Sequence, residues 1–342
     1  NHAPIQAGVR VVFMNDLPGS FSGFSDYDHA TKEFEKLKQS VSSEIVQGTN
    51  VQILPDGFDD VALSRILSKE TIIEQGLSFI RKKQTDGTKV YLINNPGGKK
   101  FEGWVVLQSN GKAIVAYDPM TGGFGKARSK NEADHTEVYL QLDPGQSLIL
   151  QFYNTAPGVE DYYYAKEESS IPVEGEWQLR FISGGPELPK PLKTRKLSYW
   201  SALGDSSYRN FSGTCSYLIN FRKPKTSSKQ YWLDLGDVKE SASVILNGRY
   251  IGTVIGPVYK LKVDAEWLKN ENVLEVRVSN LMANRVAYLD RNKIFWKKFY
   301  NVNIAARKPE NRLNGIFDAS HWQPRESGLL GPVRLILIKS RL

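Results

Sequence analysis

Three neighbouring stretches decide the fold: WLDLGDV at 232–238, ASVILNGRYIG at 242–252 and ENVLEVRVSN at 271–280. In the last stretch, valine and leucine alternate with glutamate and arginine, which is the pattern of a strand with one buried face. In the second, Asn247-Gly248 separates two apolar runs and predicts a tight hairpin turn. The three stretches together therefore predict antiparallel strands.

Working outward, the region 175–342 contains eight short apolar segments that read as strands. Eight such strands predict a jelly-roll β-sandwich. The segments lie at 177–182, 214–221, 231–235, 242–246, 250–254, 259–263, 273–279 and 332–338.

The region 76–155 is predicted to be a separate antiparallel β-sandwich. Asp86-Gly87 is a hairpin signal, and further glycine-rich turns separate short apolar runs. The runs lie at 89–94, 104–107, 113–118, 136–142 and 147–153. The segment 156–174, which is acidic and rich in tyrosine, is predicted to be a linker.

Residues 1–75 differ from the rest of the chain. An apolar run at 9–14, a periodic stretch at 28–46, a second run at 51–54 and a stretch at 58–73 predict strand, helix, strand and helix. This is a partial α/β segment, and its small size leads us to expect a fragment of a longer protein. The predicted fold class is therefore mainly β, with an α/β segment before two sandwiches.

Composition narrows the function classes. The chain has 342 residues, a formal net charge of +8 and 11% aromatic residues. Its apolar runs are much shorter than the roughly 18 residues of a membrane helix, so no membrane partner is expected. The single cysteine, Cys215, excludes an internal disulfide and a cysteine-based zinc site. The four histidines lack metal-ligand spacing, and no metal site is predicted.

A resemblance to known sugar-active proteins follows from the motifs of the last region. FSGT at 211–214, the three stretches quoted first and GLLGPV at 328–333 resemble the galactose-binding-like, sugar-binding jelly roll that accompanies family 2 glycoside hydrolases. Longer motifs extend a resemblance over the whole chain, to the C-terminal region of bacterial family 106 glycoside hydrolases, the α-L-rhamnosidase-like proteins. These motifs are GVRVVFMNDLP at 8–18, GLSFIRKKQTDGTKVYLINN at 76–95, VAYDPMTG at 115–122, VYLQLDPGQSLIL at 138–150, LMANRV at 281–286 and PRESGLLGPVRLI at 324–336.

The resemblance implies an accessory role and no catalytic residue in this chain. In that family the acid and base glutamates lie in an upstream barrel domain, which would be the partner of this region. The implied parent reaction is hydrolysis of an α-L-rhamnosidic bond in a rhamnose-containing polysaccharide, in the periplasm or outside the cell. By analogy with similar sandwiches a calcium ion is left open, although no acidic cluster calls for one, and no other cofactor is expected.

A sugar site on a sandwich uses an aromatic platform for the apolar ring face and polar side chains for the hydroxyls. The candidate platforms are Tyr199, Trp200, Trp296 and Trp322, with Asn284, Arg285 and Arg325 as donors. The alternative for each aromatic residue is packing in a core or an interface. A stand-alone carbohydrate-binding protein is the alternative to the accessory role.

The stretch 285–312 is a long basic insertion between two predicted strands. It holds eight lysine and arginine residues against two acidic residues, and Trp296, Phe299 and Tyr300 are interleaved with them. Basic and stacking groups together bind single-stranded nucleic acid, which is the weaker alternative. The expectation we favour is that the insertion packs against the catalytic domain or borders a sugar cleft.

Overall fold

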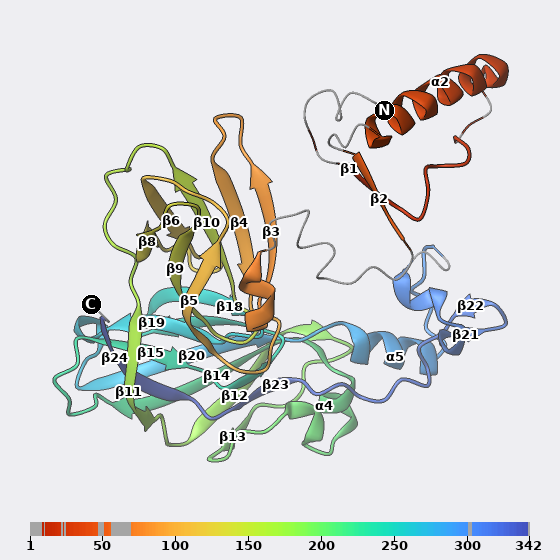
Figure 1. Cartoon of the computed structure of the whole chain (residues 1–342). Coiled ribbons are helices and arrows are strands. Elements are labelled where there is room, and N and C mark those ends of the chain that lie inside the picture. Colours follow the sequence, from red (N-terminus) through yellow and green to blue (C-terminus); the bar gives the residue numbers. More distant parts are fainter. Residues whose placement is uncertain are drawn as a thin grey trace. The chain divides into compact units, whose positions relative to one another are not determined.

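The structure is a computed structural model that describes residues 9, 11–21, 23, 25–46, 51–55, 70–299 and 303–340 (Figure 1). The chain divides into two compact units, Asn1–Glu70 and Thr71–Leu342. Strands with antiparallel pairing dominate the second unit, which confirms the mainly β fold class. No helix in the described ranges has the length and apolar character needed to cross a membrane.

The first unit has the predicted α/β character. Strands β1 (Val11–Met14) and β2 (Val51–Leu54) pair in parallel, and helix α2 (Tyr27–Val46) connects them. A small core of Leu17, Val41 and Val51 fills the space between them. The predicted helix at 58–73 falls mostly outside the described residues, and the described part of it enters the 3-10 helix η1 (Thr71–Gln75) of the second unit.

The second unit begins with a sandwich that we call the middle sandwich. One sheet has the order β3-β4-β10-β6-β7 and the other the order β5-β9-β8. Their inner faces share one apolar core, which includes Leu107, Leu140, Leu150 and Phe152. The strands are β3 (Ser78–Lys83), β4 (Lys89–Asn94), β5 (Phe101–Leu107), β6 (Ala113–Tyr117), β7 (Phe124–Lys126), β8 (Ser129–Asn131), β9 (Thr136–Leu142) and β10 (Ser147–Tyr153).

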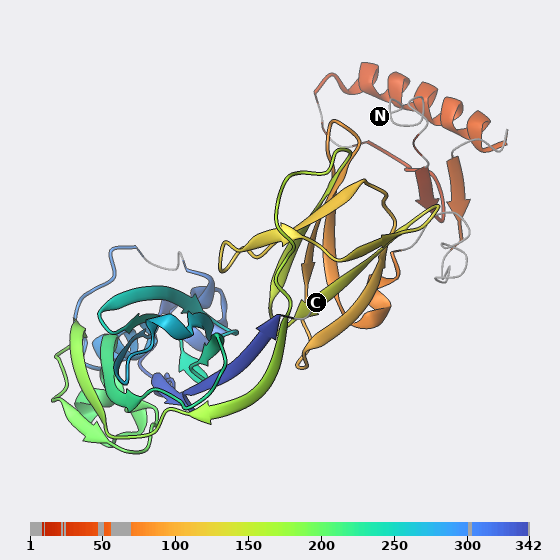
Figure 2. The same ribbon diagram turned by 90° about the vertical axis from the view of Figure 1, so that its left-hand side faces the viewer.

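A second and larger sandwich, the C-terminal sandwich, follows (Figure 2). Its sheets have the orders β11-β24-β15-β19 and β13-β12-β14-β20-β17-β18, and every pairing in them is antiparallel. Both sheets contribute side chains to one core. The strands are β11 (Ala165–Pro172), β12 (Trp177–Gly185), β13 (Leu192–Thr194), β14 (Ser212–Arg222), β15 (Gln230–Asp234), β17 (Ser241–Leu246), β18 (Arg249–Ile255), β19 (Lys260–Asp264), β20 (Glu271–Ser279) and β24 (Arg334–Ser340).

The stretches that open the sequence analysis behave as predicted. In β20, Leu274, Val276 and Val278 are buried, while the glutamate and arginine between them face outward. Asn247 and Gly248 both have positive φ, of 54° and 81°, in the turn between β17 and β18. Such angles are typical of the tight hairpin turn that Asn-Gly favours.

Short elements complete this sandwich. A pair of strands, β16 (Asp237–Lys239) and β23 (Gly328–Gly331), joins its end. Before β14 and after β19 lie η2 (Trp200–Ala202), α4 (Ser206–Asn210) and η3 (Ala265–Trp267). The insertion, which the structure extends from the predicted 285–312 to residues 283–322, contains α5 (Ala283–Arg291), η4 (Ile304–Arg307), η5 (Pro309–Asn311), β21 (Arg312–Leu313) and β22 (Ile316–Phe317).

The segment predicted as a linker, 156–174, is integrated into the structure. Residues 165–172 form β11 and pair along β24. Upstream of it, Tyr164 is buried, and its hydroxyl donates to the Tyr139 carbonyl at 3.0 Å. Polar composition suggested a linker, but an edge strand needs only one buried face and tyrosine buries its ring while its hydroxyl finds a partner.

Candidate functional site

The structure places Trp200, a predicted sugar platform, in the core of the C-terminal sandwich. Its side chain is fully buried, and its ring packs edge-on against Phe181 and Phe211 at centroid distances of 5.6 and 5.8 Å. A stacking platform must be open to its ligand, so this expectation is replaced by a packing role. The physical reason is that removing the large apolar surface of an indole ring from water stabilises the folded protein.

Two of the three predicted donors, Asn284 and Arg325, bond to each other, and the Asn284 amide also donates to the Ser327 hydroxyl at 3.3 Å. Asn284 is buried; its amide donates to the Arg325 carbonyl at 3.0 Å and accepts from the Arg325 backbone at 2.7 Å. The side chain of Arg325 itself is exposed. The Arg285 side chain lies against Gly185, and its Nε is buried without a hydrogen-bond partner. Asn284 therefore clamps the loop before β23 to α5.

Tyr199 lies in a different polar cluster at the surface. Its hydroxyl donates to Asp237, which also forms an ion pair with Lys239 at 2.9 Å. Burial and the carboxylates of Asp237 and Glu326 raise the pKa of Tyr199. The phenol is therefore protonated at neutral pH and already donates to a carboxylate.

Trp296 and Trp322 meet inside the insertion. Both rings pack edge-on against buried Phe317, at centroid distances of 6.4 and 5.7 Å. The indole nitrogen of Trp296 donates to Asp290 at 2.7 Å, and that of Trp322 donates to Asn311 at 2.8 Å. The two rings therefore belong to a small core around Phe317. Their indole nitrogens are hydrogen-bonded, and the rings are only partly buried. Among the seven predicted site residues, Asn284 bonds directly to Arg325, and Trp296 and Trp322 share Phe317 as a neighbour.

Some of the basic side chains of the insertion are paired with groups inside the insertion. Lys297 forms an ion pair at 2.9 Å with Asp290, whose side chain is only 4% exposed. The Arg312 side chain donates to the Ala306 carbonyl. Tyr300, one of the predicted stacking residues, lies outside the described residues.

A cleft lies elsewhere, between the middle sandwich and the C-terminal sandwich. This inter-sandwich cleft has a volume of about 820 Å³, within the usual range for small-molecule sites. The loop after β6, the end of β9, the segment 160–163, the loop after β18 and strand β19 line it. The side chains that matter below are Phe124, Gln141, Tyr163, Lys260 and Lys262.

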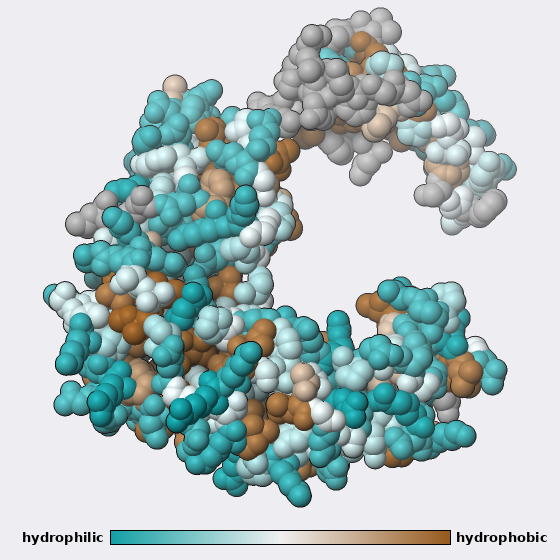
Figure 3. Space-filling view, turned by 90° about the horizontal axis from the view of Figure 1, so that it is seen from below, coloured by the Kyte–Doolittle hydropathy of each residue, from teal (hydrophilic) through white to brown (hydrophobic). Residues whose placement is uncertain are grey.

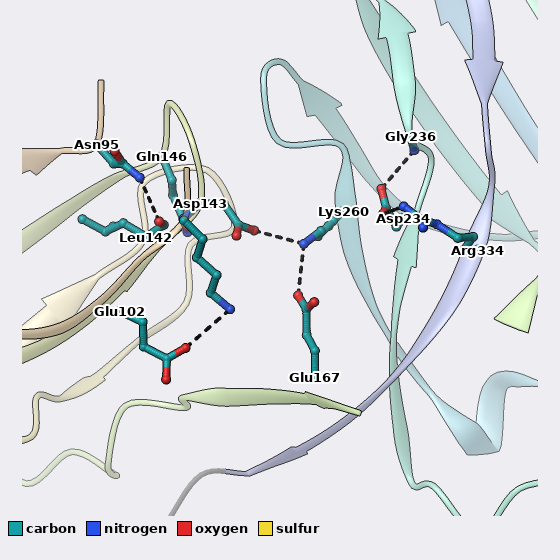
Figure 4. Close-up of polar contacts among 11 residues, drawn as sticks. Asn95, Glu102, Leu142, Asp143, Gln146, Glu167, Asp234, Gly236, Lys260 and Arg334 are labelled. Atoms are coloured by element: carbon teal, nitrogen blue, oxygen red, sulfur yellow. Dashed lines mark hydrogen bonds and ion pairs between the residues drawn. The ribbon is translucent and has the colours of Figure 1, made fainter. Parts of the chain in front are cut away.

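Lys260 ties the two sandwiches together at this cleft. Figure 4 shows its ammonium between Asp143 of the middle sandwich, at 3.2 Å, and Glu167 of β11, at 3.0 Å. Nearby, a Cβ added to Gly145 would lie 2.1 Å from the ring of Pro257, and the φ of Gly145 is +76°. Glycine is needed here both for the backbone angle and for the close approach of the two sandwiches.

The tyrosine run 162–164 places its side chains on alternating sides. Tyr162 packs on the core of the middle sandwich and Tyr164 packs against Tyr139, at 5.2 Å between ring centroids. Tyr163 also lines the cleft, and its ring faces β19, with the Lys262 ammonium 4.1 Å from the ring centroid. Such alternation follows from an extended backbone.

Two side chains that line the cleft each hold a polar atom without a hydrogen-bond partner. The Tyr163 hydroxyl and the Gln141 side-chain nitrogen are both buried and make no hydrogen bond. Burial and the Asp264 charge raise the pKa of Tyr163, so the phenol carries its proton at neutral pH. Both atoms are therefore unused donors, and a buried polar atom without a partner costs about 1–3 kcal/mol.

Seven carboxylates of the described residues have a shifted pKa, and none of these seven shifts prepares a general acid. Each Asp or Glu among them with a resolved pKa shift has its pKa lowered. A glycosidase acid needs a raised pKa and a second carboxylate across a cleft. No group of three or more His, Cys, Asp or Glu side chains suited to a metal ion occurs in the described ranges. They therefore offer no side-chain cluster for calcium.

Sequence reasoning did not find the cleft. Gln141 and Phe124 lie on short strands with ordinary composition, and only the run Tyr162-Tyr163-Tyr164 stood out. Three adjacent tyrosines in an extended segment must place at least one ring on each side, and that signal was available. The packing of the two sandwiches that creates the cleft could not be predicted from a single sequence.

The comparisons with known proteins relate the chain to part of a glycoside hydrolase. No protein-family model matches. A curated relative from Formosa agariphila, described as "Putative beta-glucuronidase", is 28% identical over 298 residues, which are 77% of this chain and 25% of the relative. The structure of a rhamnosidase from Novosphingobium sp. PP1Y superposes with a TM-score of 0.64 at 22% identity, covering 98% of this chain and 31% of that one. This chain is glycoside-hydrolase-related, and it spans a quarter to a third of the length of these two proteins.

Proposed function

We propose that this chain is the C-terminal accessory, non-catalytic region of an α-L-rhamnosidase-like glycoside hydrolase of family 106. It supports the rest of that enzyme and contacts glycan, and its C-terminal sandwich is of the galactose-binding-like jelly-roll type. The observation that carries the proposal is the combination of 98% coverage of this chain with 31% coverage of a rhamnosidase of the same fold.

The chemistry of the described residues supports the non-catalytic part of this proposal. Their resolved carboxylate pKa values are shifted downward, whereas acid catalysis at a glycosidic bond needs the opposite shift. The cleft donors, Gln141 and Tyr163, are suited to holding hydroxyl groups. Neither residue is a carboxylate that could protonate a leaving group.

The insertion supports the second part, a contact with a larger protein. Phe295, Phe299 and Ile304 are 81%, 76% and 79% exposed. Figure 3 shows apolar patches among hydrophilic residues at the end of the C-terminal sandwich that carries the insertion. Exposed apolar side chains that form a patch mark an interaction surface, and these three, from the loop after α5 and from η4, are the candidates for one.

Two measurements test the proposal. The isolated chain is incubated with p-nitrophenyl α-L-rhamnoside and p-nitrophenyl β-D-glucuronide, and we expect no release of nitrophenol above the buffer rate. The reading frame upstream of Asn1 is also sequenced, and we expect it to continue into a larger domain. Hydrolysis that disappears in a single carboxylate variant would overturn the non-catalytic role. An unrelated gene directly upstream would favour the stand-alone carbohydrate-binding protein.

A further inference from the structure

We propose that the inter-sandwich cleft is a binding site for a neutral sugar, with Phe124 as its platform and Gln141 and Tyr163 as its donors. This inference deepens the proposed function and rests on it for the class of ligand. The location differs from the region around α5 that the sequence pointed to.

The first step is the unused hydrogen-bonding capacity. Gln141 and Tyr163 both line the cleft, and the Gln141 nitrogen and the Tyr163 hydroxyl have no hydrogen-bond partner; because both atoms are closed off from solvent, each side chain must turn toward the cleft to reach a ligand. Native proteins pair nearly all such atoms, so a pair of unpaired donors in one cleft indicates a ligand with acceptor oxygens. Sugar hydroxyls provide such acceptors.

The second step is the aromatic surface. Phe124 lines the cleft and is 59% exposed, and its other face stacks on Tyr117 with a centroid distance of 5.8 Å. The ring is thus held from behind and open in front, as a stacking platform for the apolar face of a sugar ring requires. The Tyr163 ring cannot serve in this way on the face that Lys262 covers.

The third step is charge. Five carboxylates and three lysines line the cleft. Lys260 is neutralised by Asp143 and Glu167, and Glu160 and Asp161 expose their side chains. An anionic uronic acid is repelled by these carboxylates, whereas a neutral sugar can donate its hydroxyl protons to them. The cleft therefore favours neutral sugars over uronates.

The experiment measures binding to the full 342-residue chain by ligand-observed NMR and calorimetry. The probes are methyl α-L-rhamnoside, methyl β-D-galactoside and methyl β-D-glucoside, which are neutral, and methyl β-D-glucuronide, which is anionic. We expect at least one neutral glycoside to bind, and the glucuronide to bind about tenfold more weakly at low salt. This difference should shrink in 0.5 M salt because screening weakens the repulsion.

Matched variants locate the site. Phe124→Ala and Gln141→Leu should each weaken binding at least tenfold, and Tyr163→Phe about fivefold. Phe295→Ala removes an even more exposed phenylalanine from the insertion and should leave binding unchanged. Circular dichroism melting confirms that each variant is folded, and Gln141→Glu, which keeps the side-chain length but adds a charge, provides a second test at that position.

Three results would each overturn the inference: none of the three neutral glycosides binds, the cleft variants bind with unchanged affinity, or the glucuronide binds more tightly than the neutral glycosides. Failure here with no hydrolysis and a continuing upstream frame would leave the accessory role standing. Neutral-sugar binding with an unrelated upstream gene would keep the cleft site and remove the accessory role.

Discussion

The insertion and the inter-sandwich cleft both contain aromatic and polar side chains, but they differ in whether the polar atoms are hydrogen-bonded. In the insertion, the indole nitrogens of Trp296 and Trp322 each have a partner within 2.8 Å. In the cleft, Tyr163 and Gln141 have none. The difference shows that a cluster of aromatic and polar residues is no sign of a site by itself, because a satisfied cluster is already a small core.

The largest expected effect is on Trp200, which the sequence assigned to a sugar platform. Trp200→Ala should lower the free energy of unfolding by about 3–5 kcal/mol, because it empties a fully buried volume beside Phe181 and Phe211. Chemical denaturation measures the loss. A stable variant that had lost only glycan binding would restore the platform role and erase the contrast with the cleft.

Next comes Asp290, the acceptor at the centre of the insertion. Asp290→Ala should cost about 3 kcal/mol, because it leaves the Trp296 nitrogen, the Lys297 ammonium and the Ala319 amide without their acceptor. Urea unfolding followed by tryptophan fluorescence measures it. Glu310→Ala, at an exposed position of the same insertion, is the control. Equal stability of the two variants would show that the insertion is not a self-satisfied core.

Lys260 tests what holds the cleft walls together. Burial alone lowers the pKa of Lys260, but the charges and hydrogen bonds of Asp143 and Glu167 outweigh it, so its pKa is raised. A raised pKa adds stability below the ordinary lysine value of about 10.4, and this stability is lost as the pH rises through the folded-state value. Lys260→Met should cost about 1–2 kcal/mol near pH 7.

The pH dependence of the stability of Lys260→Met shows whether the contribution of Lys260 falls or rises with pH. Melting curves of wild type and Lys260→Met should differ most at neutral pH and converge as the pH rises above about 10. Lys339→Met, whose ion pair with Glu168 at 2.7 Å is 67% exposed on the lysine side, serves as the control and should change little. A gap between wild type and Lys260→Met that widens with pH would contradict the assigned interaction.

The smallest expected effect is at Tyr163. Tyr163→Phe removes a hydroxyl without a partner, so its stability should equal that of the wild type or exceed it by up to about 1 kcal/mol. The matched comparison is Tyr164→Phe, which removes a hydroxyl bonded to the Tyr139 carbonyl and should be destabilising by about 1 kcal/mol. Equal losses in the two variants would mean that Tyr163 has a structural partner and is no free donor.

Much of the fold was predictable from local pattern. The alternation in β20, the Asn247-Gly248 turn and the succession strand, helix, strand around α2 were all read from neighbouring residues, because strand period and turn angles depend on a few adjacent positions. The strand character of 165–172 was missed. Its polar composition resembles a linker, and only its pairing with β24 shows that it is an edge strand.

What the sequence by itself determined is the position of most strands along the chain, the mainly β class and the relationship to glycoside hydrolases, since these depend on periodicity and on motifs with fixed offsets. Only the tertiary structure decided which aromatic residues are buried and which polar atoms are left over. Trp200 and Phe124 are both aromatic residues beside glycine- or serine-rich segments, yet one is sealed in a core and the other faces a cleft. That difference arises from segments far apart in the chain, whose packing decides which surface is removed from water.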